Sequence, residues 1–558
     1  MYRGEYGMFT SEDNTAEELP REARLFGQKT ARSIIEVQPN VNNVADIVVL
    51  LEVLGYAKSL VMKNGFRDLY ALANYIYSFL DVYENKGENK EKFLKSFTMP
   101  IPGLTRRVVE AVGMIFPWLG SLVLLSLTGV SLWMAWGLPI QITTAFVIGV
   151  FLGLFISEGL LQIFSRLFGF YHEQTNIGEV KRLLKRSYCL LSVILCATVL
   201  SLYAYAYFER LPNGLIEITI VSTVTIAIHR ASFMIIYALK KLGHLILSYS
   251  GAFASLLLVY FFSASLIEGN IERYFTSLAV AFVILSGFAA YNHYRIIVTS
   301  LSTETDVAKP HFFRPISRTD KTIRSRFVVQ LWETLPSFLF GTFYFVMMFA
   351  DRIISWSFNP LITANGVTLP LGFNSIYHSG ADLALVVLLP TSVIQYVMMS
   401  PIFMRVNNLA VTLKVSDMKK INQFLQGTYK RLLTISLVTS VGTMTILNFL
   451  SFQILPLNGF SHESIQILHL ASIGNVFMSI FSANSLFLMM LDKRKSIAII
   501  AMVSAFIVIA GGIMLGRSGI ENITLAYLAS SITAAILSIL YILKIFKHIG
   551  SMWHARFV

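Results

Sequence analysis

Long apolar stretches separated by polar connections occupy most of this chain of 558 residues. Each stretch has roughly the 20 apolar residues that a helix needs to cross a bilayer, and the alternating polarity of a membrane-spanning strand is absent. The sequence therefore predicts an all-α polytopic membrane protein with twelve transmembrane helices. These helices are expected near residues 111–136, 140–166, 187–208, 214–239, 244–267, 273–296, 331–356, 380–405, 431–455, 465–491, 496–516 and 521–545.

Lysine and arginine gather in every second connection between these stretches, and the other connections have almost none. Examples are the segments that carry Lys240 and Lys241, then Lys493, Arg494 and Lys495. Short loops rich in Lys and Arg stay on the cytoplasmic side of a membrane. We therefore expect a multi-pass protein of the cytoplasmic (inner) membrane with both termini in the cytoplasm.

The first 105 residues differ in character from the rest. Apolar residues recur with a helical period over 41–62 and 66–85, which predicts two amphipathic helices joined at Lys63-Asn64-Gly65. Two interpretations remain open: a small cytosolic hairpin that packs on itself or on the bundle, and a docking site for another subunit. The predicted domains are a cytosolic N-terminal helical unit and linker (1–105), a first six-helix lobe (106–300), a cytosolic inter-lobe linker (301–330) and a second six-helix lobe with the C-terminal tail (331–558).

A short internal repeat supports the division into two lobes. Ile163-Phe164-Ser165-Arg166 near the end of the second stretch resembles Ile402-Phe403-Met404-Arg405 near the end of the eighth, although chance can produce so short a match. A basic amphipathic segment follows each one, at 178–186 and 416–430. Two halves of like orientation are a common transporter plan, with the substrate path between them.

Each basic segment combines an apolar stripe with lysine and arginine, which suits a helix that lies in the membrane interface. We expect the two segments to form a positive cytosolic rim that contacts anionic lipid or the substrate machinery. The alternative is that they only anchor the topology. The rim residues are Lys181, Arg182, Lys185, Arg186, Lys419 and Lys420.

Composition narrows the functional class. The chain is 55% hydrophobic and 14% charged, and its net charge of +13 lies where topology and anionic lipid require it, so nucleic acid is not an expected partner. No phosphate-binding loop, zinc signature or nucleophile elbow is present. Cys189 and Cys196 lie on one face of the third stretch and indicate neither a metal site nor a structural disulfide. The sequence thus predicts a protein without enzymatic activity, metal or cofactor.

The chain resembles the MOP exporter superfamily, which includes MATE drug exporters and polysaccharide flippases, in its two six-helix halves and its basic segments after helices two and eight. A closer resemblance is to the PelG family of exopolysaccharide transporters. Asp351, Arg352 and Trp356 match a motif of helix seven in that family, and Ile376-Tyr377 and Ala381-Asp382-Leu383 are also similar. The resemblance covers roughly residues 105–550 and implies a membrane exporter of a glycan, supplied by a cytosolic glycosyltransferase. The longer N-terminal unit departs from the PelG pattern.

Charged residues within the apolar stretches are costly in a bilayer and are the candidates for the substrate pathway. His229 and Arg230 lie about 10 residues from the cytosolic end of their helix, hence roughly 15 Å deep. They are expected either to line an aqueous path between the lobes or to pair with a buried carboxylate. The other candidates are Glu158, Glu333, Asp351 and Arg352.

Structural interpretations also remain open. Asp351 and Arg352, near the outer end of their helix, can form a local ion pair in which Arg352 reaches lipid headgroups, and Glu333 is expected close to the cytosolic surface. Asp382 is expected at the start of helix eight, where a carboxylate favours the helix dipole. Pro117 and Pro336 interrupt the corresponding helices of the two lobes and predict either hinges or simple curvature.

The sequence therefore favours an exporter or flippase that moves a polysaccharide or lipid-linked glycan by alternating access. Two alternatives stay open: a MATE-like ion-coupled antiporter for small cations, and a membrane scaffold of a polysaccharide synthase complex that transports nothing. The expected partners are membrane lipid, the glycan, and a cytosolic glycosyltransferase with other membrane subunits, engaged through residues 1–105. Because no ATPase motif is present, we expect the energy to come from an ion gradient, from polymer synthesis or from a partner.

Overall fold

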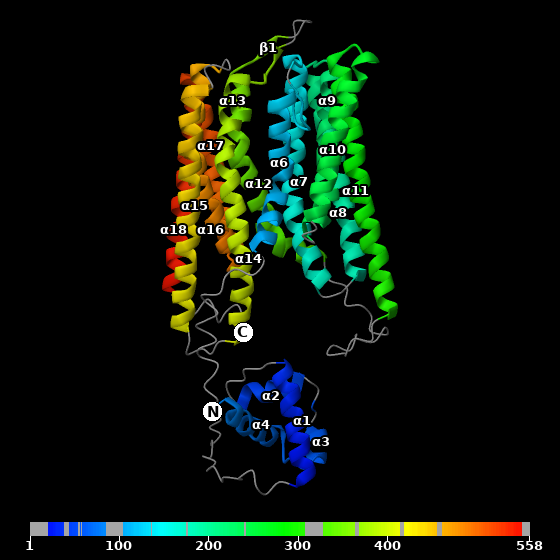
Figure 1. The fold of residues 1–558 in the computed structure, drawn as a ribbon, viewed down its shortest axis with the longest axis vertical. Coiled ribbons are helices and arrows are strands. Elements are labelled where there is room, and N and C mark those ends of the chain that lie inside the picture. The colour runs from blue at the N-terminus through cyan, green and yellow to red at the C-terminus, as the bar shows by residue number, and fades with distance from the viewer. Residues whose placement is uncertain are drawn as a thin grey trace, which may run out of the picture. The chain divides into compact units, whose positions relative to one another are not determined.

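The structure is a computed structural model, and its chain divides into two compact units (Figure 1). One unit comprises Met1–Pro102, Pro401–Gln426 and Ile549–Val558, and the other comprises Gly103–Ser400 and Gly427–His548. The structure describes residues 20–37, 44–53, 56, 58–84, 104–135, 137–173, 177–238, 242–306, 327–362, 368–412, 418–454 and 460–548.

The described residues of the N-terminal segment form four helices around an apolar core of their own. These are α1 (Arg21–Val37), α2 (Val44–Val53), α3 (Lys58–Lys63) and α4 (Leu69–Glu84). Ile34, Ile47, Leu51, Leu72 and Ile76 are fully buried together. The helix predicted at 66–85 is found as α4, whereas the one predicted at 41–62 is divided into α2 and α3. Helix α1 is not predicted from the sequence, because its charged residues obscure its apolar stripe.

The second unit contains helices long and apolar enough to cross a membrane, and the described residues hold twelve of them. This agrees with the predicted all-α fold and with a multi-pass membrane protein. The first six spans are α6 (Leu104–Thr128), α7 (Ile140–Glu173), α8 (Ile177–Phe208), α9 (Asn213–Ala238), α10 (Leu242–Phe262) with the 3₁₀ turn η1 (Ser263–Ser265), and α11 (Asn270–Asp306). The others are α12 (Phe327–Ser357), α13 (Ser375–Ala384) joined through η2 (Leu385–Val387) to α14 (Leu388–Thr412), α15 (Met418–Ile454), α16 (His462–Met490), α17 (Arg494–Leu515) and α18 (Ile523–Lys547).

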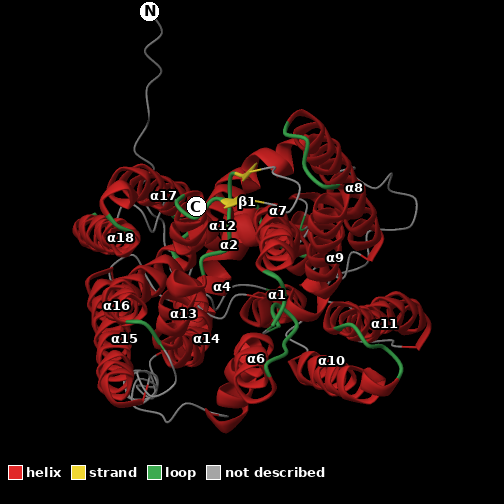
Figure 2. Cartoon of the chain, turned by 90° about the horizontal axis from the view of Figure 1, so that it is seen from above, coloured by secondary structure: helices red, strands yellow, loops and turns green. Residues whose placement is uncertain are grey.

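The spans group into two lobes by their packing, and the view of the bundle from above shows this grouping (Figure 2). In the first lobe α7 packs on α9, and α10 packs on α6 and α11. In the second lobe α12 packs on α17, α18 packs on α16 and α17, and α13 packs on α16. The principal contact between the lobes joins α7 to α12. The arrangement confirms the predicted two-lobe architecture, while the predicted domain boundaries stay predictions and most of 301–330 lies outside the described residues.

Glycines allow two of these helix pairs to approach closely. A β-carbon on Gly149 of α7 would lie 1.9 Å from Ser222 Oγ of α9, so these helices meet through small residues. Between the lobes, a β-carbon on Gly159 of α7 would lie 2.5 Å from Thr342 Oγ1 of α12. A β-carbon on Gly341 of α12 would lie 2.7 Å from Gln162 Cγ of α7. The inter-lobe contact therefore has no space for larger side chains.

The first span ends earlier than the sequence predicts. Helix α6 stops at Thr128, because Gly129 adopts a left-handed conformation with φ of 74° that ends the helix. A tight turn follows, in which the backbone N–H of Ser131 donates to the carbonyl of Met134 at 2.8 Å. The prediction of helix for 129–135 is thus wrong, and residue 136 lies outside the described residues. The second lobe has a short hairpin after α12, in which β1 (Leu361–Ile362) pairs with β2 (Thr368–Leu369).

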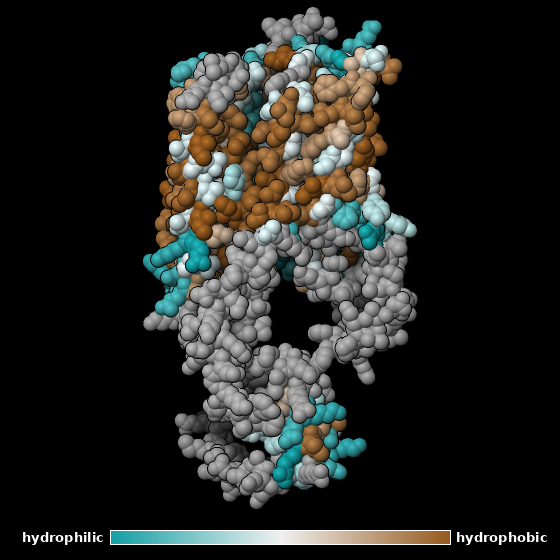
Figure 3. All heavy atoms as spheres, viewed as in Figure 1, coloured by the Kyte–Doolittle hydropathy of each residue, from teal (hydrophilic) through white to brown (hydrophobic). Residues whose placement is uncertain are grey.

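The outer face of the bundle carries a broad belt of apolar side chains, with hydrophilic side chains toward its two ends (Figure 3). Leu200, Val283 and Phe506 are each 70% exposed, as expected of side chains that face lipid. Two free cysteines, Cys189 and Cys196, are also exposed on α8.

The basic segments are not separate helices. Residues 178–186 form the first part of α8 and continue without a break into its apolar part, and α15 likewise begins at Met418. The expectation of distinct elements that lie along the interface is therefore wrong: the backbone hydrogen bonds of each segment are continuous with those of its span. In α8, Arg182 pairs with Glu179 at 2.9 Å.

Candidate functional site

A cavity of about 510 Å³ lies between the two lobes. Its first-lobe wall comes from α6, α7, α9 and α10, and its second-lobe wall comes from α12, α13, η2 and the start of α14. We call it the inter-lobe cavity. The side chains that matter below, all lining it, are Pro117, Trp118, Leu154, Glu158, Gln162, Ser165, Arg230, Tyr249, Phe349, Phe373, His378 and Asp382.

The first-lobe wall holds an ion pair between two helices. Arg230 of α9 donates through a terminal guanidinium nitrogen to the carboxylate of Glu158 on α7. Gln162, one turn further along α7, donates to the other carboxylate oxygen at 3.0 Å. The guanidinium also lies 6.0 Å from the ring of Phe345 on α12, so the pair reaches the facing lobe. The structure brings Glu158 and Arg230 together in the manner of the buried-carboxylate alternative, and both also line the cavity.

His229, the neighbour of Arg230, points into the first lobe and is 2% exposed. Its Nε2 lies 2.8 Å from the hydroxyl of Tyr249, and its ring packs against Phe233 and Phe282 at 4.6 and 5.4 Å. Tyr249 lines the cavity, but His229 does not. His229 therefore supports the wall from behind, through Tyr249.

The second-lobe wall holds a larger charged network, centred on Arg352 of α12. Its terminal nitrogen donates to Asp351 Oδ1 at 2.9 Å, and its Nε donates to Asp382 Oδ1 at 2.7 Å. The same guanidinium also donates to the carbonyls of Met348 and Ala381, at 3.0 and 2.8 Å. Arg352 and Asp351 are buried, at 2% and 0% exposure, so Arg352 does not extend to the membrane surface. The guanidinium instead joins α12 to α13.

His378 of α13 extends this network. Trp356 Nε1 donates to His378 Nε2 at 3.0 Å, and the indole has no other role than donor. Nε2 therefore accepts, and Nδ1 carries the proton that it donates to Asp382 Oδ2 at 2.8 Å. The imidazole is held between the rings of Phe373 and Trp356, with centroids at 4.4 and 5.6 Å.

The network continues away from the cavity to the last helix of the lobe. The hydroxyl of Tyr377 donates to Asp351 Oδ2 at 2.8 Å and accepts from Thr524 of α18 at 3.3 Å. Tyr377 and Thr524 are fully buried. A chain of hydrogen bonds thus joins the Asp382 carboxylate, at the cavity, to α18 on the far side of the lobe.

Asp382 is the part of this network that the cavity reaches, since 44% of its side chain is exposed. The interpretation of Asp382 as a helix-capping residue is wrong. Helix α13 begins at Ser375, and its cap is Asn374, whose side chain accepts from the backbone N–H of Tyr377. Asp382 lies two turns further on, where its carboxylate faces the cavity. The helix then passes through the 3₁₀ turn η2, and such a turn within a span often marks a hinge.

The remaining predicted residues lie elsewhere. Glu333 is exposed near the start of α12 and does not line the cavity. Lys181, Arg182, Lys185 and Arg186 lie at the start of α8, where Lys185 is exposed. Lys419 and Lys420 belong to the first turn of α15, and their side chains lie outside the described residues. Pro117 and Pro336 lie within α6 and α12, and Pro117 lines the cavity.

Sequence reasoning did not identify His378 or Trp118 as part of the site. His378 is four residues before Asp382, and this spacing places both side chains on one helix face, so the signal was present. Trp118 gave no such signal, because a tryptophan in an apolar span is usual at a membrane interface. Only the packing of α6 against the second lobe shows that its ring faces the cavity, with 43% exposure and stacked on Phe349.

The ion pair in the first-lobe wall and the network in the second-lobe wall differ in net charge. Glu158 and Arg230 cancel each other. In the second lobe, Asp351 and Asp382 share the single guanidinium of Arg352, which leaves one net negative charge while His378 is neutral. With its mixed aromatic and charged lining, the cavity is suited to hold a polar ligand, and its second-lobe wall is suited to a positive charge.

No family model and no curated protein sequence matches the chain. Solved structures do. A MATE transporter in complex with MaD3S is similar with a TM-score of 0.54 at 14% identity, over 81% of this chain and 96% of that one. The chain has the MATE transporter fold.

Two further MATE structures show this fold in different states. An inward-facing multidrug resistance MATE transporter of the MOP superfamily has a TM-score of 0.53 at 14% identity, over 80% of this chain and 98% of that one. An outward-facing one has a TM-score of 0.52 at 13% identity, over 81% and 95%. At this identity the likeness concerns the MATE fold alone, and the role of the cavity residues must be argued from their own chemistry.

Proposed function

We propose that this protein is a membrane exporter that moves a polysaccharide or lipid-linked glycan outward by alternating access of the inter-lobe cavity. The observation that carries the proposal is the cavity itself. Both lobes contribute to its walls, and it combines aromatic faces with ion-paired side chains where the lobes meet. A sugar offers complementary surfaces, since its C–H faces pack on aromatic rings and its hydroxyls bond to carboxylates and guanidinium groups.

The fold supports movement between two states. The MATE structures that this chain resembles include an inward-facing and an outward-facing one. Here the lobes touch mainly through α7 and α12, close to Gly159 and Gly341, so a rocking motion would disturb few other contacts. The 3₁₀ turn η2 and Pro117 lie at the cavity, where a bend would change its opening. The resemblance of Asp351, Arg352 and Trp356 to the PelG motif favours an exopolysaccharide as cargo, delivered by a cytosolic glycosyltransferase.

One observation favours a second candidate, an ion-coupled antiporter for small organic cations. The second-lobe network carries an excess carboxylate that faces the cavity at Asp382, which would attract a cation or exchange a proton. An antiporter of this kind needs a gradient and no glycan. Glycan export can in contrast be driven by polymer synthesis or by a partner.

Filling the cavity provides the test. Leu154→Trp places an indole in the cavity, and Leu200→Trp makes the same change on the outer face of α8, where the side chain is 70% exposed. Purified protein in lipid vesicles would be tested for translocation of a fluorescent lipid-linked oligosaccharide and for gradient-driven uptake of ethidium. We expect glycan translocation that Leu154→Trp abolishes and Leu200→Trp leaves intact.

Other outcomes would reject the proposal in different ways. Ethidium uptake without glycan translocation would establish the antiporter instead. Absence of both, with folded protein and with the glycosyltransferase supplied, would leave the scaffold of a synthase complex. Equal loss in the two variants would show that the inter-lobe cavity is not the path.

A further inference from the structure

A second cavity of about 180 Å³ lies beside the inter-lobe cavity, on the side of the second lobe. We call it the side pocket. It is formed by α6, α12, α14 and α16, and it shares Met114, Trp118, Leu385 and Leu389 with the inter-lobe cavity. The shared residues make the two spaces neighbours, so a ligand in the larger one can extend a single group into the smaller one. At about 30 Å³ for each water in the liquid, the side pocket has space for one ring-sized group.

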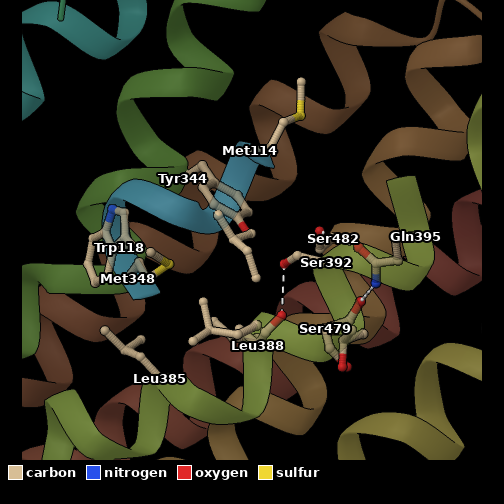
Figure 4. Close-up of a pocket in the computed structure, with 13 residues that line it drawn as sticks. Met114, Trp118, Tyr344, Met348, Leu385, Leu388, Ser392, Gln395, Ser479 and Ser482 are labelled. Carbon is tan, nitrogen blue, oxygen red and sulfur yellow. Dashed lines mark hydrogen bonds between the residues drawn. The ribbon is translucent and has the colours of Figure 1, made fainter. Parts of the chain in front are cut away.

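One wall of the side pocket is aromatic. Figure 4 shows Trp118 and Tyr344 on the side opposite Gln395 and Ser479. Trp118 is stacked on Phe349 with ring centroids 6.0 Å apart and planes at 24°, and 43% of its surface is exposed. Tyr344 is stacked on Phe481 at 6.2 Å, also at 24°. Each of these two rings lines the pocket, and stacking on a second ring fixes its orientation.

The opposite wall is polar and is built around Gln395, which is 2% exposed (Figure 4). Its Nε2 donates to the carbonyl of Ser479 at 2.9 Å and reaches Ser436 Oγ at 3.4 Å. Its Oε1 accepts from Ser482 Oγ at 2.9 Å. Both amide protons are thus used inside the protein, whereas Oε1 has a second lone pair that can accept from a ligand.

The other hydroxyls of this wall also donate their protons within the protein. Ser392 donates to the carbonyl of Leu388 at 2.8 Å, Thr391 to that of Val387 at 3.2 Å, and Ser479 Oγ to that of Val476 at 2.7 Å. Each hydroxyl proton is directed to the backbone, which leaves the oxygens as acceptors. The wall therefore presents acceptors to a ligand that brings donors.

Charge separates the side pocket from the inter-lobe cavity. Each of the 13 residues that line the side pocket is uncharged, whereas Glu158, Arg230 and Asp382 line the larger space. A cationic group would lose its hydration in the side pocket without a counter-charge. An alkyl chain would cover the acceptors of Gln395 and the serines without bonding to them. A neutral ring with hydroxyl donors and a C–H face satisfies both walls.

We propose that the side pocket is a subsite for one neutral, hydroxyl-bearing sugar ring, stacked against Trp118 and hydrogen-bonded to Gln395 and its neighbouring serines. This deepens the proposed function and rests on it, since a glycan must enter the inter-lobe cavity first. The subsite selects the cargo by its chemistry: a neutral sugar unit is accepted, and a unit with an ammonium or carboxylate group is left in the larger cavity.

The test measures protection of single cysteines by sugars, in a background in which Cys189 and Cys196 are replaced by serine. Ser392→Cys reports on the side pocket, and the matched Ser165→Cys reports on the inter-lobe cavity alone. The purified variants would react with a small maleimide in the presence of cellobiose, a neutral disaccharide, or of the diamine disaccharide from chitosan. We expect cellobiose to slow the reaction of Ser392→Cys about tenfold, and the diamine to slow it much less.

Two changes to the walls connect protection to the residues named. Gln395→Leu should raise the cellobiose concentration needed for protection about tenfold, because it removes the central hydrogen-bonding group. Trp118→Ala should do the same, while Trp118→Phe keeps a ring face and should retain protection. Thermal unfolding of each variant shows that the bundle is intact. The matched substitution Gln466→Leu, at an exposed position of α16 that lines neither cavity, should leave the protection of Ser392→Cys in place.

The outcomes distinguish a failure of the proposed subsite from a failure of the proposed glycan export. If cellobiose protects Ser165→Cys and not Ser392→Cys, the subsite is overturned and the glycan cavity stands. If it protects neither, both are overturned. Equal protection by the neutral and the diamine sugar, or protection that survives Gln395→Leu and Trp118→Ala, overturns the assignment of a neutral sugar to these residues.

Discussion

The indole N–H of Trp356 donates to Nε2 of His378 at 3.0 Å, and this single contact sets the direction of the second-lobe network. Because Nε2 accepts, the proton of the neutral imidazole is on Nδ1 and points to Asp382. The tryptophan is on α12 and the histidine on α13, so the contact also fixes one helix against the other. Trp356 thereby orients the Asp382 carboxylate at the cavity, through His378.

Replacing the indole should release this orientation. We expect Trp356→Phe to lower the free energy of unfolding by about 1–3 kcal/mol, because it leaves a buried acceptor unpaired, and to reduce transport. Trp332→Phe is the matched control on the same helix, since Trp332 is 75% exposed and should tolerate the change. Thermal unfolding and transport would be measured in parallel. A Trp356→Phe protein as stable and as active as the parent would show that the contact has no such role.

Removing the guanidinium of Arg352 alone should destabilise the protein more than removing it together with one of its carboxylate partners. Breaking a buried ion pair from one side costs about 3–5 kcal/mol, since it leaves an uncompensated charge. We expect Arg352→Met to reduce the amount of folded protein strongly, and Arg352→Met with Asp351→Asn to recover part of it. Yield and monodispersity after gel filtration are the measurements. If the double variant is no better than the single one, the charge balance described here is not what stabilises the lobe.

The pair of Glu158 and Arg230 allows stability and transport to be separated. Arg230→Met leaves Glu158 unpaired and should lower stability, whereas Arg230→Met with Glu158→Gln should restore it in large part. Transport should remain reduced in the double variant, because both charges also line the cavity. Full recovery of transport with stability would make the pair purely structural.

The rim on α8 remains a prediction that a quadruple variant can test. Replacing Lys181, Arg182, Lys185 and Arg186 by glutamine removes four positive charges, each worth roughly 1 kcal/mol near an anionic leaflet. We expect weaker export at equal expression, and weaker retention by vesicles that contain anionic lipid. Export equal to that of the parent would leave these residues as topological anchors only.

The orientation in the membrane is open to direct labelling. In a cysteine-free background, Asn365→Cys and Ser461→Cys should react with a membrane-impermeant maleimide added outside the cell. Lys309→Cys and Ser416→Cys should react only after the membrane is permeabilised. The reason is the alternation of basic connections, which predicts a cytoplasmic position for Lys309 and Ser416. Reaction of Lys309→Cys from outside would contradict the predicted topology.

The spans and the two lobes could be predicted from sequence because the bilayer sets a requirement that each stretch of the chain meets by itself. Any helix that crosses it needs about 20 apolar residues, whatever it packs against. All twelve predicted stretches therefore correspond to spans in the structure. The exceptions are local: Gly129 ends α6 early, and the basic segments merge into α8 and α15, since a hydrogen-bonded helix continues where nothing breaks it.

The sequence also identified which charged residues are costly in a membrane, but it did not identify their ion-pair partners. Glu158 and Arg230 are 72 positions apart, and Arg352 and Asp382 are 30 apart, so only the packing of α7 on α9 and of α12 beside α13 decides these partners. The same holds for the side pocket, where Trp118 and Gln395 come from different lobes. Composition and hydropathy fix what each helix can tolerate, whereas a site needs side chains from several helices at bonding distance, which tertiary packing alone supplies.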